Sequence, residues 1–170
     1  MCYEAHLKNT TKLIRKIGAL IFGGTKLNSY LCRMGKYFTI EELCRSSKAK
    51  ANGIDNKPND VQKANMERFI SVILDPIREK WGAQIIVNSG YRCELLNKLV
   101  GGVSNSHHRY LNNYCAADIT TKCKIKNAKL YKMIKDMNLP ICQCIDEYGF
   151  QWIHVSYHPT DIRKHFFHEK

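Results

Sequence analysis

The longest periodic pattern of apolar residues in the chain begins after Asn59. From there to Trp81, apolar side chains return every three or four positions, which predicts one long helix. Pro76 is expected to kink or divide this helix, and Gly82 is expected to end it. The buried side of the helix is predicted to consist of Val61, Phe69, Ile70, Ile73, Ile77 and Trp81.

Shorter helices are predicted on both sides of this one. Thr39 is followed by Glu42 at the spacing of a capping box, which predicts a helix over residues 40–46. Residues 47–59 are polar and rich in turn-forming side chains, so they are expected to form a loop. Further helices are predicted over residues 93–100 and 127–137.

Short apolar segments between the helices predict β-strands. In the last of them, alternation with a period of two places Trp152, His154 and Ser156 on one face, and the residues between them in the core. Strands and helices follow one another without a regular β-α-β order, so an α+β fold is expected. The predicted strands are residues 85–87, 116–119, 141–147 and 152–157.

The charge of the chain narrows the classes of partner. Its 170 residues include 27 lysines and arginines against 15 acidic residues, a formal net charge of +12. Such a surface attracts polyanions, and nucleic acid, anionic membrane and acidic cell-wall polymer all qualify. No apolar run approaches the roughly 20 residues that cross a bilayer. We therefore expect a globular protein without a transmembrane segment.

The chain is expected to divide into two parts. Residues 1–33 form a basic N-terminal extension, which is interpreted as an extra helix or a flexible segment. The alternative is a surface-lying membrane or wall anchor. Residues 34–170 are predicted to form the main domain.

The cysteines are expected to be reduced. No convincing secretory signal precedes the domain, because the apolar patch at residues 17–22 is short and a good cleavage site is missing after it. The eight cysteines contain no Cys-x-x-Cys pair, so a zinc ribbon is not indicated. They are interpreted as buried or incidental thiols.

Histidines and acidic residues indicate a candidate metal site. A catalytic zinc ion takes three protein ligands and keeps one position open, and His108, Asp118 and His154 can supply such a set. Glu147 ends a predicted strand in phase with Gln143, which makes it the candidate for proton transfer. The residues alone leave a second interpretation open, in which Asp118 satisfies a turn and His154 is a hydrogen-bonded core residue.

Arg92 is the candidate for binding an anionic group. It follows the predicted strand through Ser-Gly-Tyr, where a guanidinium can clamp a substrate carboxylate or stabilise charge that develops during reaction. The alternative is an ordinary surface ion pair.

Several short motifs occur in a fixed order between Tyr37 and Tyr157. They are YFTIEEL (37–43), LDPIR (74–78), SGYR (89–92), LNKLVGG (96–102), SHH (106–108), AADI (116–119) and WIHVSY (152–157). In this order they resemble the M15 zinc peptidases, the D-Ala-D-Ala carboxypeptidase-like family that cuts bacterial peptidoglycan peptides. The resemblance is closest to the short, single-domain form found in phages and bacteria.

The resemblance implies a fold and a set of roles. The fold is a small antiparallel sheet flanked by helices, as in D,D-carboxypeptidases and hedgehog-like zinc peptidase domains. The ligands of Zn²⁺ are then His108, Asp118 and His154, with His107 as second choice for the first. Glu147 matches the catalytic glutamate and Arg92 the substrate-binding arginine. Further substrate contacts are expected from Ser106, Gln143 and Trp152.

The segment between the first two implied ligands departs from the family pattern. Residues 109–115 form a longer loop than usual and contain no glycine. Asn112 or Asn113 is expected to adopt the left-handed conformation that a glycine would supply.

The function implied is that of a zinc metallopeptidase acting on the peptide stem of bacterial peptidoglycan. Both a D-Ala-D-Ala carboxypeptidase and an endopeptidase fit, and so does a phage lysis enzyme. We expect a monomer without a specific nucleic-acid partner, made in the host bacterial cytoplasm and released to the wall, or associated with the virion. The alternative is a non-catalytic protein on the same fold that binds cell wall or a polyanion such as nucleic acid.

Overall fold

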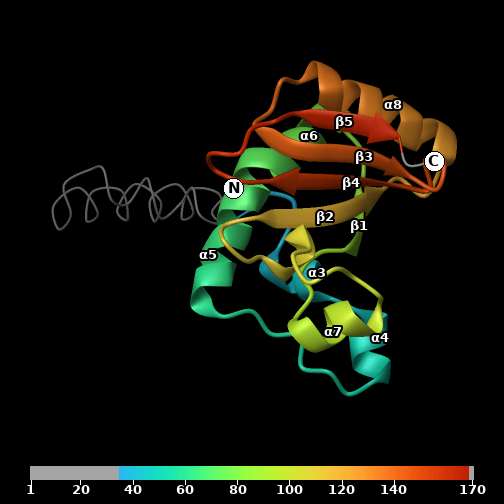
Figure 1. The fold of residues 1–170 in the computed structure, drawn as a ribbon. Coiled ribbons are helices and arrows are strands. Elements are labelled where there is room, and N and C mark those ends of the chain that lie inside the picture. Colours follow the sequence, from blue (N-terminus) through green and yellow to red (C-terminus); the bar gives the residue numbers. More distant parts are fainter. Residues whose placement is uncertain (1–34, 169–170) are drawn as a thin grey trace, which may run out of the picture. The chain divides into compact units, whose positions relative to one another are not determined.

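One mixed sheet organises the part of the chain that the structure, a computed structural model, describes, namely residues 35–168 (Figure 1). Its strand order is β1-β2-β4-β3-β5, and helices pack around it, so the predicted α+β class is confirmed. The strands are β1 (Ile86–Ser89), β2 (Cys115–Thr120), β3 (Ile141–Glu147), β4 (Trp152–Tyr157) and β5 (His165–His168).

The helices flank the sheet in two groups (Figure 1). The helices are α3 (Ile40–Cys44), α4 (Ser47–Ala51), α5 (Asp60–Phe69), α6 (Asp75–Trp81), α7 (Glu94–Leu99) and α8 (Lys124–Asp136), with a π-helix at Ile70–Leu74 and a 3₁₀ turn at His107–Arg109. None of these helices is long and apolar enough to cross a membrane. The predicted basic extension over residues 1–33 lies outside the described residues.

The predicted antiparallel sheet is correct for four strands and wrong for the fifth. β1, β2, β4 and β3 pair antiparallel, whereas β5 pairs with β3 in parallel. The chain reverses after β4 and crosses to the far edge of β3, so β5 runs in the same direction as β3. The sequence of β5, His-Phe-Phe-His, is short and lacks the alternation by which the other strands were predicted.

The predicted long helix remains helical through Pro76 without dividing. Ahead of the proline, residues Ile70–Leu74 form a π-helix, in which the N–H of Asp75 donates to the carbonyl of Ile70. The wider turn of the π-helix accommodates Pro76, which lacks a backbone N–H and whose ring crowds the preceding turn. Gly82 ends the helix in the left-handed conformation (φ 70°), as predicted.

One predicted loop and one predicted buried residue also differ from the structure. Residues 47–59, expected to be loop, contain the short helix α4, which Ser46 caps by accepting a hydrogen bond from the N–H of Ala49. Val61, predicted to be buried, is exposed on α5. The cap on α4 is a local contact over three residues, and Val61 lies in the first turn of α5.

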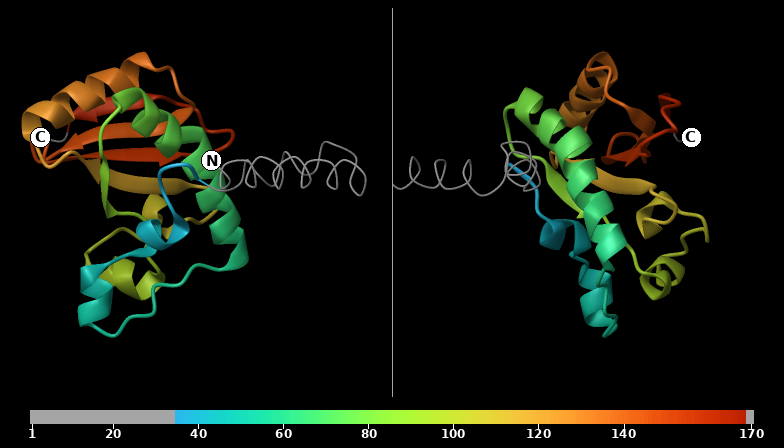
Figure 2. Two further views of the ribbon diagram at one scale, coloured as in Figure 1. Left: turned by 180° about the vertical axis from the view of Figure 1, so that it is seen from behind. Right: turned by 90° about the vertical axis from the view of Figure 1, so that its left-hand side faces the viewer.

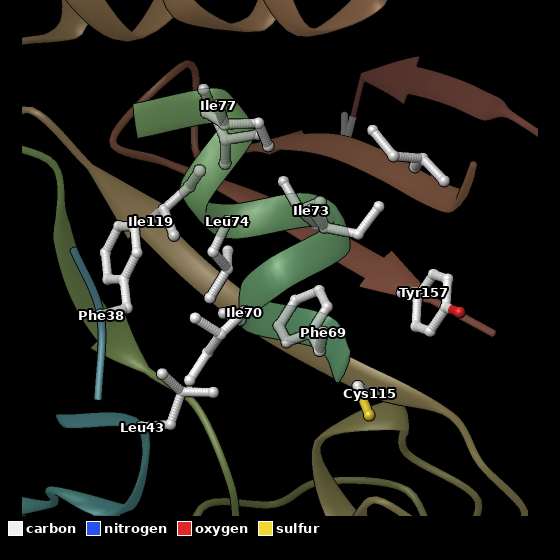
Figure 3. Close-up of a cluster of buried hydrophobic side chains, with 14 of the residues drawn as sticks. Phe38, Leu43, Phe69, Ile70, Ile73, Leu74, Ile77, Cys115, Ile119 and Tyr157 are labelled. Atoms are coloured by element: carbon white, nitrogen blue, oxygen red, sulfur yellow. The ribbon is translucent and has the colours of Figure 1, made fainter. Parts of the chain in front are cut away.

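The main hydrophobic core lies between α5–α6, α8 and one face of the sheet (Figure 2). Figure 3 shows Phe69, Ile73 and Ile77 of the long helical segment beside Ile119 and Tyr157 of the sheet. Helix α8 adds Leu130 and Ile134, which are fully buried. Burial of this apolar surface holds the helices to one face, and the other face of β2 and β4 is left for polar side chains.

Asn127 ties helix α8 to the ends of two strands. Its Oδ1 accepts hydrogen bonds from the backbone N–H and the hydroxyl of Thr121, both at 2.8 Å. Its Nδ2 donates to the Thr120 hydroxyl and to the carbonyls of Phe150 and Gln151 at 2.9–3.0 Å. The side chain is completely buried, so the hydrogen bonds that it makes with the Thr121 N–H and the Phe150 carbonyl are formed away from solvent.

We predict that Asn127→Ala lowers the free energy of unfolding by about 3 kcal/mol, because it removes a buried side chain that makes five hydrogen bonds. Alanine favours the helix more than asparagine does, so the loss cannot come from helix propensity. Urea denaturation measures the change, and Lys129→Ala, an exposed position on the same helix, is the control, expected within about 0.5 kcal/mol of wild type. Equal stability of the two variants would contradict the anchoring role.

Candidate metal centre

Three predicted ligands come together on the face of the sheet opposite the core. Asp118 on β2 and His154 on β4 are directly paired across the two antiparallel strands. His108 reaches them from the 3₁₀ turn that precedes β2. All three side chains are buried, and one donor atom from each lies within a cluster suited to a single ion.

The three donor atoms form a nearly equilateral triangle. His154 Nδ1 is 3.0 Å from Asp118 Oδ1, and His108 Nε2 is 3.2 Å both from that oxygen and from His154 Nδ1. Ligands of tetrahedral zinc, each about 2.0–2.1 Å from the ion, lie about 3.3 Å apart. Two imidazoles and a carboxylate with this spacing therefore fit a zinc ion with a fourth position open.

The tautomer of His108 is set by a backbone carbonyl. His108 Nδ1 lies 2.7 Å from the carbonyl oxygen of Gly90. A carbonyl only accepts hydrogen bonds, so Nδ1 carries a proton and Nε2 is the ring nitrogen that faces Asp118 and His154. In the neutral ring Nε2 offers a lone pair, which is the form in which a histidine binds a metal ion.

Gly90 is required where it stands because the backbone of α3 approaches it closely. A Cβ at this position would come within 2.4 Å of the carbonyl oxygen of Leu43. The next residue, Tyr91, donates its N–H to that same oxygen at 2.8 Å. This close packing fixes the carbonyl that orients His108.

Arg92 holds the second oxygen of Asp118. Its guanidinium donates to Asp118 Oδ2 at 2.9 Å, and its Nε donates to the Ser89 hydroxyl at 2.9 Å. The sequence predicted a contact with substrate and missed this contact with a ligand residue. Arg92 also lines the cleft described below.

The surroundings of Asp118 keep its carboxylate ionised. Burial by itself raises the pKa of a carboxyl group. The contacts with His108 and His154 outweigh burial and hold the pKa of Asp118 well below its ordinary value. An ionised carboxylate is the form that binds a metal ion.

Glu147 lies beside the triangle without joining it. It is paired with Trp152 across β3 and β4, and the Trp152 indole N–H donates to Glu147 Oε2 at 2.8 Å. The other oxygen, Oε1, is 4.0 Å from His154 Nδ1. Its neighbour Asp146 points to the opposite face and contacts His168, as the strand alternation predicted. Trp152 therefore positions Glu147, a role that the sequence did not reveal.

A cleft of about 920 Å³ adjoins this centre. Of the predicted substrate contacts, Arg92 and Trp152 line it, whereas Ser106 and Gln143 are not among the lining residues of the described chain. The Ser106 hydroxyl instead accepts a hydrogen bond from the N–H of His108, and Gln143 accepts one from the hydroxyl of Ser156. The lining comes from β1, β2, α3, α4, α7 and the β3–β4 hairpin, and includes Asp118 and Glu147.

The long loop before β2 is built as its asparagines predicted. Asn112 and Asn113 both adopt positive φ angles, 51° and 65°. His107, the second choice for a ligand, turns away from the triangle and stacks on Tyr114, with ring centroids 4.2 Å apart. His158 packs on the other side of this pair and donates from Nε2 to the carbonyl of Asn112. The Tyr114 and His158 contacts were not predicted, because they join segments far apart in the chain.

Comparison with known proteins assigns the chain to a protein family. The family model described as Peptidase M15 matches residues 36–156, from just before α3 to the end of β4. A search of curated proteins finds no match. The matched region covers well over half of the 170 residues and contains the whole triangle and Glu147. The chain therefore belongs to the peptidase M15 family, whose members are metallopeptidases that usually use zinc.

Proposed function

We propose that this protein is a zinc-dependent peptidase that hydrolyses the peptide stem of bacterial peptidoglycan. The observation that carries the proposal is the triangle of His108, Asp118 and His154 with Glu147 at its side. The family supports peptidase chemistry, and the ordered motifs resemble those of peptidoglycan peptidases. The excess of positive charge also suits a polyanionic cell wall.

The described residues can divide the work of hydrolysis. When bound, zinc supplies Lewis acidity, which makes water a nucleophile near neutral pH and polarises a carbonyl group. Glu147 takes the proton of the attacking water at Oε1 and passes it to the leaving amine. Trp152 holds the other carboxylate oxygen, so the reactive one stays turned towards the centre.

Arg92 serves both the centre and the substrate in this proposal. One guanidinium nitrogen fixes the orientation of Asp118. A further N–H group facing the cleft is available to a substrate carboxylate or to the developing oxyanion. Release of a terminal D-Ala and cleavage of an internal bond are both compatible with this arrangement.

Removal of metal is expected to abolish hydrolysis of purified peptidoglycan, and addition of stoichiometric Zn²⁺ is expected to restore it, whereas Mg²⁺ prefers six oxygen ligands and will not. Mass spectrometry of the released peptides measures activity and identifies the bond that is cut. Elemental analysis is expected to find one zinc per wild-type chain and per chain of the control His165→Ala, and much less in His154→Ala. Full activity of the metal-free protein would refute the proposal.

Glu147→Gln is expected to lower kcat by about 10²–10⁴ while zinc content stays at the wild-type level. Glutamine keeps the shape and can still accept the hydrogen bond from Trp152, so the loss isolates the proton transfer. Glu79→Gln, the same chemical change on α6 across the sheet, is the control and is expected to leave kcat unchanged. A Glu147→Gln enzyme with wild-type kcat would remove Glu147 from the mechanism.

A further inference from the structure

The cleft beside the metal centre has a basic rim. Arg45, Lys48 and Lys50 line the same cleft as Asp118 and Glu147. All three basic residues are exposed, and within residues 35–168 none of them forms an ion pair. We call these three residues the α4 rim.

The α4 rim keeps an excess of positive charge. Apart from the two carboxylates of the metal centre, Glu42 is the only acidic residue that lines the cleft in the described chain. Burial raises the pKa of Glu42, although Arg45 opposes this shift. One carboxylate cannot balance three cations, so this end of the cleft attracts anions.

The α4 rim is also fixed in place relative to the metal centre. Ser46 caps α4, and Ala49 buries the inner side of the helix, so Lys48 and Lys50 on either side of it face outwards. The preceding helix α3 is joined to the metal-centre segment by the hydrogen bond from Tyr91 to Leu43. A rigid connection of this kind holds a binding group at a set distance from the reacting bond.

We propose that the α4 rim binds a free carboxylate of the peptide substrate and so selects acidic peptides. This inference rests on the proposed function, because it extends the same cleft. A volume of about 920 Å³ leaves room for a short peptide between the metal centre and the rim. Each exposed ion pair contributes about two- to fivefold in affinity, so the three residues together are expected to give about tenfold.

Two synthetic stem peptides that differ only in one carboxylate near the scissile bond, free or amidated, test the inference. The wild-type, zinc-loaded protein is expected to show about tenfold lower KM for the free acid, with equal kcat. This preference should shrink as salt increases from low to high concentration. The triple variant Arg45→Gln, Lys48→Gln, Lys50→Gln is expected to lose the preference by a rise in KM alone.

The matched control removes three lysines from α8, Lys124→Gln, Lys129→Gln and Lys132→Gln, which lie on the helical side of the sheet away from the cleft. It makes the same change in net charge and is expected to keep the preference. Equal KM values for the two peptides with wild-type protein, or an unchanged preference in the rim variant, would overturn the inference and leave the peptidase proposal intact.

The two proposals fail in distinguishable ways. If the wild-type protein cleaves neither peptide, the proposed substrate is wrong. Calorimetric titration of the zinc-loaded protein with both peptides then tests the rim directly. Tighter binding of the free acid by wild type but not by the rim variant supports the rim, and equal binding of both peptides overturns it.

Discussion

The antiparallel pairing of β2 with β4 is the constraint on which the candidate site depends. It sets Asp118 opposite His154 on one face, while Ala117, Ile119, Ile153 and Val155 fill the core on the other. A slip of one residue in either strand would carry its ligand into the core and its apolar neighbours out. The hydrophobic core therefore fixes the register, and the register fixes the spacing of the ligands.

Residues 89–92, the Ser-Gly-Tyr-Arg motif, hold the ligand residues in position. The Ser89 hydroxyl accepts a hydrogen bond from Arg92 Nε, and the Gly90 carbonyl accepts one from Nδ1 of His108. The N–H of Tyr91 donates to the backbone of α3, and the Arg92 guanidinium donates to Asp118. The Ser-Gly-Tyr-Arg motif thus carries positioning contacts for two of the three ligands. The sequence indicated only the last of its residues, as a contact for substrate.

Alternation along the strands and the choice of residues in loops correctly predicted several side-chain orientations and backbone conformations. Alternation in β4 placed His154 opposite the core, and the phase of β3 favoured Glu147 over Asp146. The left-handed asparagines followed from the absence of glycine in their loop. By contrast, the pairing of β5 with β3 and the bond from Arg92 to Asp118 join segments whose proximity is set by tertiary packing. No periodicity in the chain encodes such proximity, so these features had to come from the structure.

The last strand has a consequence for how the domain behaves among copies of itself. β5 follows the region that the family model matches and covers the outer edge of β3, whose buried apolar residues include Ile141 and Cys144. An open edge of this kind offers a row of backbone donors and acceptors on which a strand from another molecule can form. The appended strand occupies those groups within the same chain, since β5 pairs with β3 from Gln143 to Asp146. The edge of β3 is therefore closed by a strand of the same chain, and only the short strand β5 is left at that side of the sheet.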